Sequence, residues 1–151
     1  MKNSFELIFT NKILITGLVA WCVSQVLKTL IYVIVNREFK LERLVGDGGI
    51  PSSHSATVTA VATMIGLTSG WDSPLFALAF IFAVIVMHDA RGVRLETGKQ
   101  AKVINDLTEL IETLVGQDLT PEDKLKELVG HTPLQVLSGF ILGVIIALIM
   151  I

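Results

Sequence analysis

Four apolar stretches alternate with charged connectors along the chain. The first covers residues 13–36 and contains one charged residue, Lys28. The others cover residues 52–70, 74–90 and 133–151. About twenty consecutive apolar residues form a helix long enough to cross the hydrocarbon core of a bilayer. The pattern therefore predicts an all-α integral membrane bundle with about four spans, formed by a single membrane domain that occupies residues 1–151.

The segment 91–130 interrupts this apolar pattern and is polar or amphipathic. Its apolar residues recur at helical spacing, which predicts a helix for the membrane surface or for a partner helix. They are Val103, Ile104, Leu107, Leu110, Ile111 and Leu114. Gly116 is expected to end this helix, and Thr120 and Pro121 to begin another short surface helix that stops at Gly130.

The last span carries its own start signal. Thr132 and Gln135 have the spacing of a capping box, with Pro133 at the first helical position. Farther along, Gly139, Gly143 and Ala147 follow one another at intervals of four, which places small side chains on one helix face. We therefore expect a helix from Pro133 onward that packs closely against a neighbour.

Composition supports a membrane location. Hydrophobic residues make up 52% of the chain and charged residues 17%, with a mean hydropathy of +0.67. The first span is too long for the core of a signal peptide, so we expect it to be retained. The net charge of −2 gives no case for nucleic-acid binding. The single cysteine, Cys22, excludes internal disulfides and cysteine-rich metal sites.

Candidate chemistry begins at the sequence GGIPSSHSA, residues 48–56. Pro51 suits the first turn of a helix, and Ser52, Ser53 and His54 follow it directly. Free N–H groups at a helix start, two hydroxyls and an imidazole could together bind a phosphate-like anion. The alternative is an ordinary N-cap serine followed by a histidine at the membrane interface.

Four spans place the polar candidates on one side of the membrane. The first and third spans end, and the second and fourth begin, at the same face. All three histidines, His54, His88 and His131, fall there, as do Lys28 and the charged connector 37–47. We therefore expect one polar site at that face. The count of Lys and Arg favours the cytoplasmic side.

Three segments resemble a known family. GGIPSSHSATVTA, HDARGVRLETGKQA with Asn105, and GHTPLQVLSG are similar to the divergent branch of the type 2 phosphatidic acid phosphatase superfamily, which is related to acid phosphatases and vanadium-dependent haloperoxidases. The resemblance implies metal-free hydrolysis of phosphomonoesters without a cofactor, in a multi-pass protein of a bacterial cell membrane. It implies that His131 is the nucleophile and that His54 protonates the leaving alcohol.

The resemblance also assigns supporting roles. The phosphate-binding candidates are Lys28, Arg43, Ser52, Ser53, Arg91 and Arg94. The supporting candidates are Asp89, Gln100, Asn105 and Gln135. The chain departs from the superfamily pattern at the first motif, where Val35 and Asn36 replace arginine and proline. It also departs at Leu125, where an arginine is expected, and at Gln135, where an acid is expected.

These departures leave three functional hypotheses. The first is a phosphatase for a lipid phosphate or polyprenyl phosphate, in a homo-oligomer, expected to be a dimer. The second is a binder or transporter of lipid phosphates that keeps the anion pocket, favoured by the uncharged Gln135. The third is a metal-dependent site that would use His54, His88, Asp89 and His131, because imidazole and carboxylate suit zinc or manganese.

Overall fold

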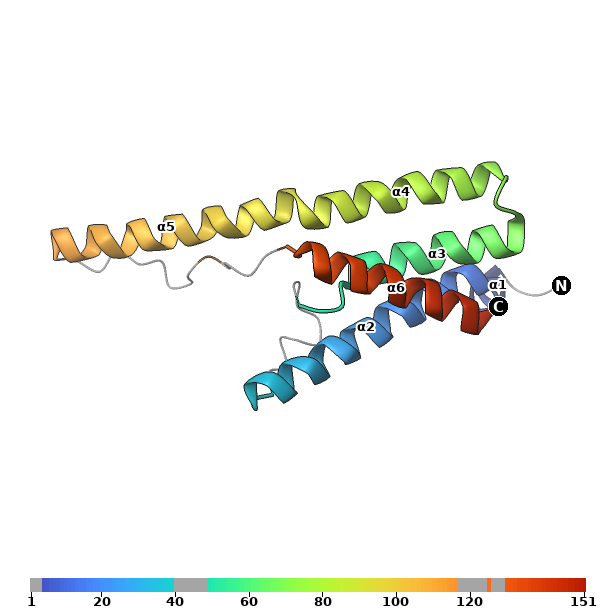
Figure 1. The fold of residues 1–151 in the computed structure, drawn as a ribbon, viewed down its shortest axis with the longest axis horizontal. Helices are drawn as coiled ribbons and strands as arrows, with labels where there is room; N and C mark the ends of the chain where they lie inside the picture. Colours follow the sequence, from blue (N-terminus) through green and yellow to red (C-terminus); the bar gives the residue numbers. More distant parts are fainter. Residues whose placement is uncertain (1–3, 40–48, 117–124, 126–129) are drawn as a thin grey trace.

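The fold is all-α, as predicted (Figure 1). The computed structural model describes residues 4–39, 49–116, 125 and 130–151. Within these ranges there are five long helices and a six-residue helix. They are α1 (Ser4–Phe9), α2 (Lys12–Asn36), α3 (Ser53–Ser69), α4 (Pro74–Arg91), α5 (Val93–Val115) and α6 (Pro133–Met150).

Local capping interactions explain where the helices begin. Ser52 caps α3 and Ser73 caps α4, each through a side-chain oxygen that accepts a backbone N–H of the first turn. At α6, Thr132 and Gln135 form the complete capping box that the sequence predicts, with Pro133 in the first turn. Gly116, in the left-handed conformation, ends α5 as expected.

Helix α3 lies at the centre of the bundle and packs against α2, α4 and α6. Its side chains Ala56, Ala60 and Met64 are completely buried. Ala60 joins Ala20 of α2 and Ile146 of α6 in the hydrophobic core. Because most of α3 faces protein, its small and hydroxyl-bearing residues contact neighbouring helices instead of lipid.

The small-residue stripe of α6 makes the closest helix contact. A Cβ atom at Gly139 would overlap the backbone carbonyl oxygen of Ser52, and one at Gly143 would lie 2.9 Å from the Cβ atom of Thr59. Ala147, the third residue of the stripe, is also completely buried. The predicted close contact is therefore confirmed, and it places the start of α6 directly beside the start of α3.

Among the described residues, three stretches are long and apolar enough to cross a membrane, instead of the four expected from the sequence: Lys12–Asn36, Pro74–Val115 and Pro133–Met150. Helix α3, which corresponds to the predicted span 52–70, has 17 residues and is not among them. Its surroundings explain the difference, because a helix enclosed by other helices does not need an apolar surface around its whole circumference.

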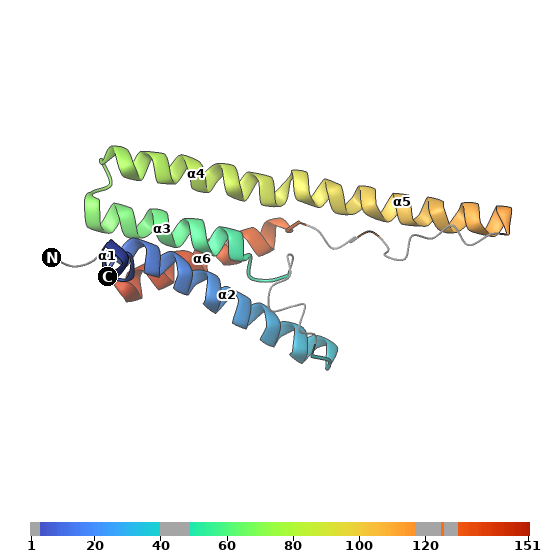
Figure 2. The same cartoon turned by 180° about the vertical axis from the view of Figure 1, so that it is seen from behind.

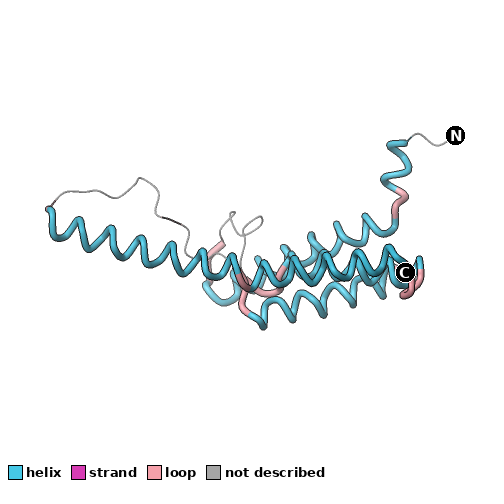
Figure 3. Tube along the Cα trace, turned by 90° about the horizontal axis from the view of Figure 1, so that it is seen from above, coloured by secondary structure: helices cyan, strands magenta, loops and turns pink. Residues whose placement is uncertain are grey.

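The polar segment after α4 continues as a helix. Helices α4 and α5 are separated only by Gly92 and form one extended rod that leaves the bundle (Figures 1 and 3). The apolar residues of α5 are largely exposed, including Leu107, Leu110 and Leu114. The amphipathic helix is thus confirmed, whereas the second surface helix expected near Pro121 lies outside the described residues.

The two ends of the bundle differ in chemistry, as the topology predicts. Helix α1, the end of α6 and the turn between α3 and α4 lie at one end (Figure 2). At that end, the Lys12 ammonium donates a hydrogen bond to the Ile151 carbonyl. The starts of α3 and α6 lie at the other end, together with the last turn of α4. The candidate site lies at this second end.

Candidate functional site

Two histidines, one from the first turn of α3 and one just before the N-cap residue of α6, form a contacting pair. Nδ1 of His54 is 3.3 Å from Nε2 of His131, and the two ring centroids are 5.5 Å apart. His131 is buried, with 1% of its surface exposed, whereas His54 is half-buried. The accessible side of the pair is therefore the His54 side.

Gln135 determines which nitrogen of His131 carries the proton. Its Oε1 atom lies 3.0 Å from the backbone nitrogen of Thr132 and 3.3 Å from Nδ1 of His131. The Thr132 N–H can only donate, so the oxygen of the amide faces both groups and accepts. His131 must then donate from Nδ1, which leaves a lone pair on Nε2 in the neutral ring. That lone pair faces His54.

Three hydrogen bonds, each donated by a backbone N–H group, hold the pair in place. The N–H of His131 donates to the carbonyl of Ala90 in α4, with a distance of 2.9 Å. The N–H of Ser52 donates to the carbonyl of Gln135 at 3.0 Å, which connects the start of α3 to the first turn of α6. The Thr132 N–H bond to Gln135 completes this framework. The site is thus built on three helices whose mutual positions are fixed.

Ser52 and Ser53 are both buried at the start of α3. The Ser52 hydroxyl oxygen accepts from the N–H of Ser55, at 3.3 Å, and from the Ser55 hydroxyl, at 3.1 Å. Its oxygen is therefore used for capping, while its own proton has no acceptor in the described part of the chain. The positive end of the α3 dipole lies at the same point, next to His54.

Lys28 lies near this site although it belongs to α2. It is 3% exposed, and its aliphatic stem passes Gly49, where an added Cβ would approach the Lys28 Cγ to 2.9 Å. Lys28 and Gln135 line the same cavity, of about 220 Å³, together with Tyr32 and Asn36. The structure therefore brings the predicted cation into a cavity that it shares with Gln135, the residue that orients His131.

The predicted cations and acid of the HDARGVR motif occupy different places. Arg91, the last residue of α4, is exposed and lines a second cavity together with Pro133 at the start of α6. Asp89 is half-buried in the same last turn of α4. Arg94 lies in the first turn of α5, while Arg43 falls outside the described residues. Arg91 is thus the arginine of this motif that lies next to the His131 loop.

Gln100 and Asn105 are not brought to the histidine pair. They lie on α5, nine and fourteen residues beyond Arg91, which corresponds to about 14 and 21 Å of helix. Gln100 is exposed. The Asn105 side chain exchanges two hydrogen bonds with the backbone of Leu125, at 3.0 and 3.2 Å. Asn105 therefore ties the chain after α5 back to that helix.

The residues of the metal hypothesis do not converge. His88 is exposed on α4, at a position away from the contact between His54 and His131 that the site is built on. Among the described residues, no group of three or more His, Cys, Asp or Glu side chains has a geometry that could hold a metal ion.

Two groups near the site are not among the residues that the sequence analysis predicted. The carbonyl of Ala90 acts through the backbone, and no property of the alanine side chain predicts this role. Gln25, one turn before Lys28, is buried, and within the described part of the chain its Oε1 atom has no hydrogen-bond partner. The polar row Ser24, Gln25 and Tyr32 around Lys28 is the feature of the sequence that pointed to it.

Comparison with known proteins shows a relative and a family for this chain. The chain is 41% identical to "Uncharacterized membrane protein YuiD" of Bacillus subtilis (strain 168), over 95% of this chain and 96% of that protein. No solved structure matches the chain. The relative is named a membrane protein, and the three apolar stretches of this chain are long enough for several membrane crossings. The protein is therefore a multi-pass membrane protein. The sequence model described as "Divergent PAP2 family" matches residues 9–146, so the chain belongs to the Divergent PAP2 family.

Proposed function

We propose that the protein is a membrane phosphatase that hydrolyses the phosphomonoester of a lipid phosphate without a metal ion. The observation that carries the proposal is the buried His131, whose Nε2 lone pair faces His54 while Gln135 binds its Nδ1. An imidazole held in this tautomer is a nucleophile, and a second imidazole beside it can transfer protons.

The reaction proceeds in two halves. In the first, Nε2 of His131 attacks phosphorus and forms a P–N bond, while the P–O bond to the leaving group breaks. Protonated His54 gives its proton to the leaving oxygen, so the product is a neutral alcohol. In the second, neutral His54 takes a proton from water as the water oxygen attacks phosphorus. The P–N bond breaks, its electrons return to Nε2, and inorganic phosphate leaves.

Substrate binding must separate the two rings. A distance of 3.3 Å between the two nitrogens is that of direct contact and leaves no space for a phosphoryl group. His131 is fixed by Gln135 and by the Ala90 carbonyl, so His54 is the ring that moves. His54 is half-buried on the accessible side, which makes a different rotamer possible.

Positive groups around the pair would stabilise the charge on the transferring phosphoryl group. The start of α3 contributes backbone N–H groups and the hydroxyl protons of Ser52 and Ser53. Lys28 and Arg91 approach from α2 and α4. The neutral Gln135 holds His131 in place but stabilises an imidazolium less well than a carboxylate does, so turnover should be slower than with an acid at this position.

The experiment is a phosphate-release screen with purified protein in detergent or nanodiscs. Phosphatidate, phosphatidylglycerophosphate and polyprenyl phosphate are compared for wild type and His131→Ala, with and without EDTA. We expect release that EDTA does not reduce and that His131→Ala abolishes. Activity that survives His131→Ala overturns the mechanism.

A second candidate function is binding or transport of lipid phosphates without hydrolysis. The uncharged Gln135 at the position that orients His131 favours it. The same screen separates the two functions, because a binder would retain vanadate or lipid phosphate in an equilibrium assay and release no phosphate from any substrate.

We also propose how the helices cross the membrane and how two copies of the protein associate. Helix α3 crosses together with α2, α4 and α6, which gives four crossings and leaves the site at one membrane face. Two copies form a dimer through apolar surface that the bundle leaves uncovered, such as the exposed stripe on α5. Crosslinking in native membranes followed by mass determination tests the dimer.

A further inference from the structure

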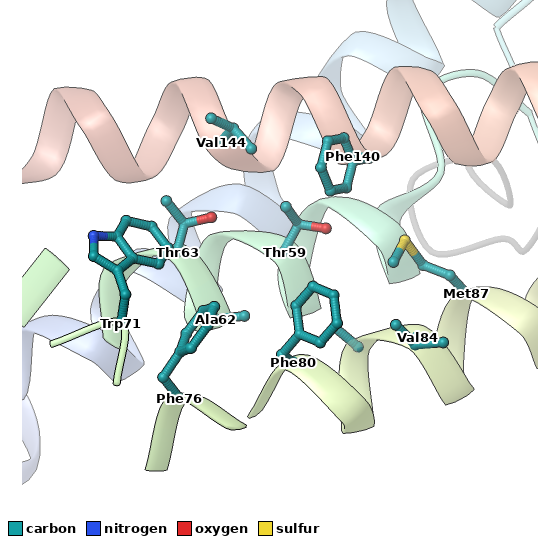
Figure 4. Close-up of a pocket in the computed structure, with 11 residues that line it drawn as sticks. Thr59, Ala62, Thr63, Trp71, Phe76, Phe80, Val84, Met87, Phe140 and Val144 are labelled. Atoms are coloured by element: carbon teal, nitrogen blue, oxygen red, sulfur yellow. The ribbon is translucent and has the colours of Figure 1, made fainter. Parts of the chain in front are cut away.

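An apolar groove runs between α3, α4 and α6 and ends beside the candidate site. Its floor is formed by Ala62, Ala83 and Thr59, all buried, and its rim by Phe80 and Phe140, which are 50% and 41% exposed (Figure 4). Its volume is about 220 Å³. Because the rim belongs to helices that face the bilayer, lipid chains are the molecules that can enter from the side.

The groove continues toward the histidines. Met87 and Phe140 line it and also line the neighbouring cavity of about 340 Å³, whose other residues include Arg91 and Pro133. Arg91 follows Ala90, the residue whose carbonyl binds the His131 N–H. Two adjoining cavities therefore lead from an apolar floor to Arg91, which directly follows the residue whose carbonyl holds His131.

The length of the groove suits one leaflet of a bilayer. Phe76 and Met87 lie at its two ends on α4, eleven residues apart, which corresponds to about 16 Å of helix. Half of a hydrocarbon core of about 30 Å is nearly the same length. A lipid with its phosphate at His131 would extend a chain along the groove to the level of Trp71.

The hydroxyl of Thr59 indicates which class of lipid chain fits the groove best. Other threonines of α2 and α3, such as Thr29 and Thr57, donate their hydroxyl to the carbonyl four residues earlier. Thr59 is 4% exposed, and its Oγ1 atom has no hydrogen-bond partner within the described residues. Figure 4 shows its side chain between the rings of Phe80 and Phe140. A buried hydroxyl without a partner is costly, so a ligand that offers an acceptor at this point is favoured.

We propose that this groove binds an ester-linked acyl chain of a glycerol-based lipid phosphate, with the Thr59 hydroxyl donating to the ester carbonyl. Thr59 follows His54 by five residues, or about 7.5 Å of helix. In such a lipid the ester lies a three-carbon backbone away from the phosphate, whereas a polyprenyl phosphate has no carbonyl. The inference rests on the proposed function because it deepens the identity of the substrate.

The first test does not depend on turnover. Full-length protein is labelled with a diacyl phosphatidate that carries a photoreactive diazirine in one chain, and the labelled peptides are mapped by mass spectrometry. We expect labels on α3, α4 and α6, and a several-fold loss of labelling in Ala83→Phe, which fills the floor. Ile81→Phe, on the exposed face of the same helix, is the matched control and retains labelling. Labelling that is equal in Ala83→Phe and wild type overturns the groove.

The second test addresses Thr59. Competition for labelling is measured with a diester lipid phosphate, its diether analogue of equal chain length, and a polyprenyl phosphate. Wild type should prefer the ester by about two- to tenfold, the effect of one neutral hydrogen bond. The isosteric Thr59→Val should lose this preference. A preference that persists in Thr59→Val, or a polyprenyl phosphate that competes as well as the diester, overturns the role of Thr59.

Different results would contradict the proposed phosphatase activity and the proposed lipid groove. Labelling of the groove without phosphate release from any substrate would contradict the phosphatase and support the groove. Phosphate release together with labelling that Ala83→Phe does not change would support the phosphatase and overturn the groove.

Discussion

Nδ1 of His54 and Nε2 of His131 lie 3.3 Å apart although 77 positions separate the two residues in the chain. His54 is in the first turn of α3, and His131 is one residue before the cap of α6. The contact exists because Gly139 and Gly143 let α6 approach α3 at close range. Each of the following predictions concerns one part of this arrangement.

Replacing His54 should affect substrates according to their leaving group. A general acid contributes about 10²- to 10⁴-fold to a rate when the leaving oxygen needs a proton. We expect His54→Gln to lower kcat within that range for an alkyl phosphate and by much less for p-nitrophenyl phosphate, whose leaving group departs as an anion. His131→Ala should abolish both reactions. An equal loss for both substrates in His54→Gln would contradict the role of His54 as a proton donor.

Gln135 has a structural and a positioning role that two variants separate. Thr132→Ala removes one half of the capping box and should lower the stability of the folded protein by about 1 kcal/mol. It leaves the Thr132 N–H and the Gln135 bond to His131 in place, so kcat should change little. Gln135→Leu removes both interactions and should lower kcat by at least about 100-fold.

The variant Gln135→Glu tests the same position in the opposite direction from Gln135→Leu. A carboxylate would accept from the same two N–H groups and stabilise the imidazolium of His131, so kcat should rise above the wild-type value. Thermal unfolding of all variants, measured in the same detergent, serves as the control. A Gln135→Leu protein with wild-type kcat would mean that Gln135 only caps α6.

Lys28 should bind the phosphate group. A hydrogen bond to a charged group contributes about 1.5–3 kcal/mol, so Lys28→Met should weaken vanadate or phosphate inhibition by about 10- to 150-fold. Lys12→Met is the matched control, because it removes a cation from the other end of the same helix. Equal inhibition constants for the two variants would place Lys28 outside the site.

The glycine stripe of α6 should be sensitive to added volume. Gly139→Ala places a methyl group on the Ser52 carbonyl, and overpacking of this kind costs about 1–3 kcal/mol. Since the same shift separates α6 from α3, kcat should fall together with the melting temperature. Ile149→Leu, on the exposed face of α6, is the control and should change neither quantity. A Gly139→Ala protein as stable and active as wild type would show that the two helices adjust without cost.

The sequence alone determined where most of the long helices begin and end, and at which end of the bundle the polar residues lie. Helix starts at Ser52, Ser73 and Thr132 follow from local hydrogen bonds, and the ends at Gly70 and Gly116 from local backbone conformation. The order of apolar stretches placed His54 and His131 at the same end, because antiparallel neighbours bring alternate connections together.

Only the tertiary structure decided which of those residues meet. Side-chain contacts between α3 and α6 depend on helix rotation and on how closely the glycines allow approach, and neither is encoded within one helix. The path of α5, which separates Gln100 and Asn105 from the histidines, is likewise seen only in the three-dimensional structure, where α5 continues α4 past Gly92 and leaves the bundle. The Ala90 carbonyl joins the site through the backbone, and every residue type carries that group.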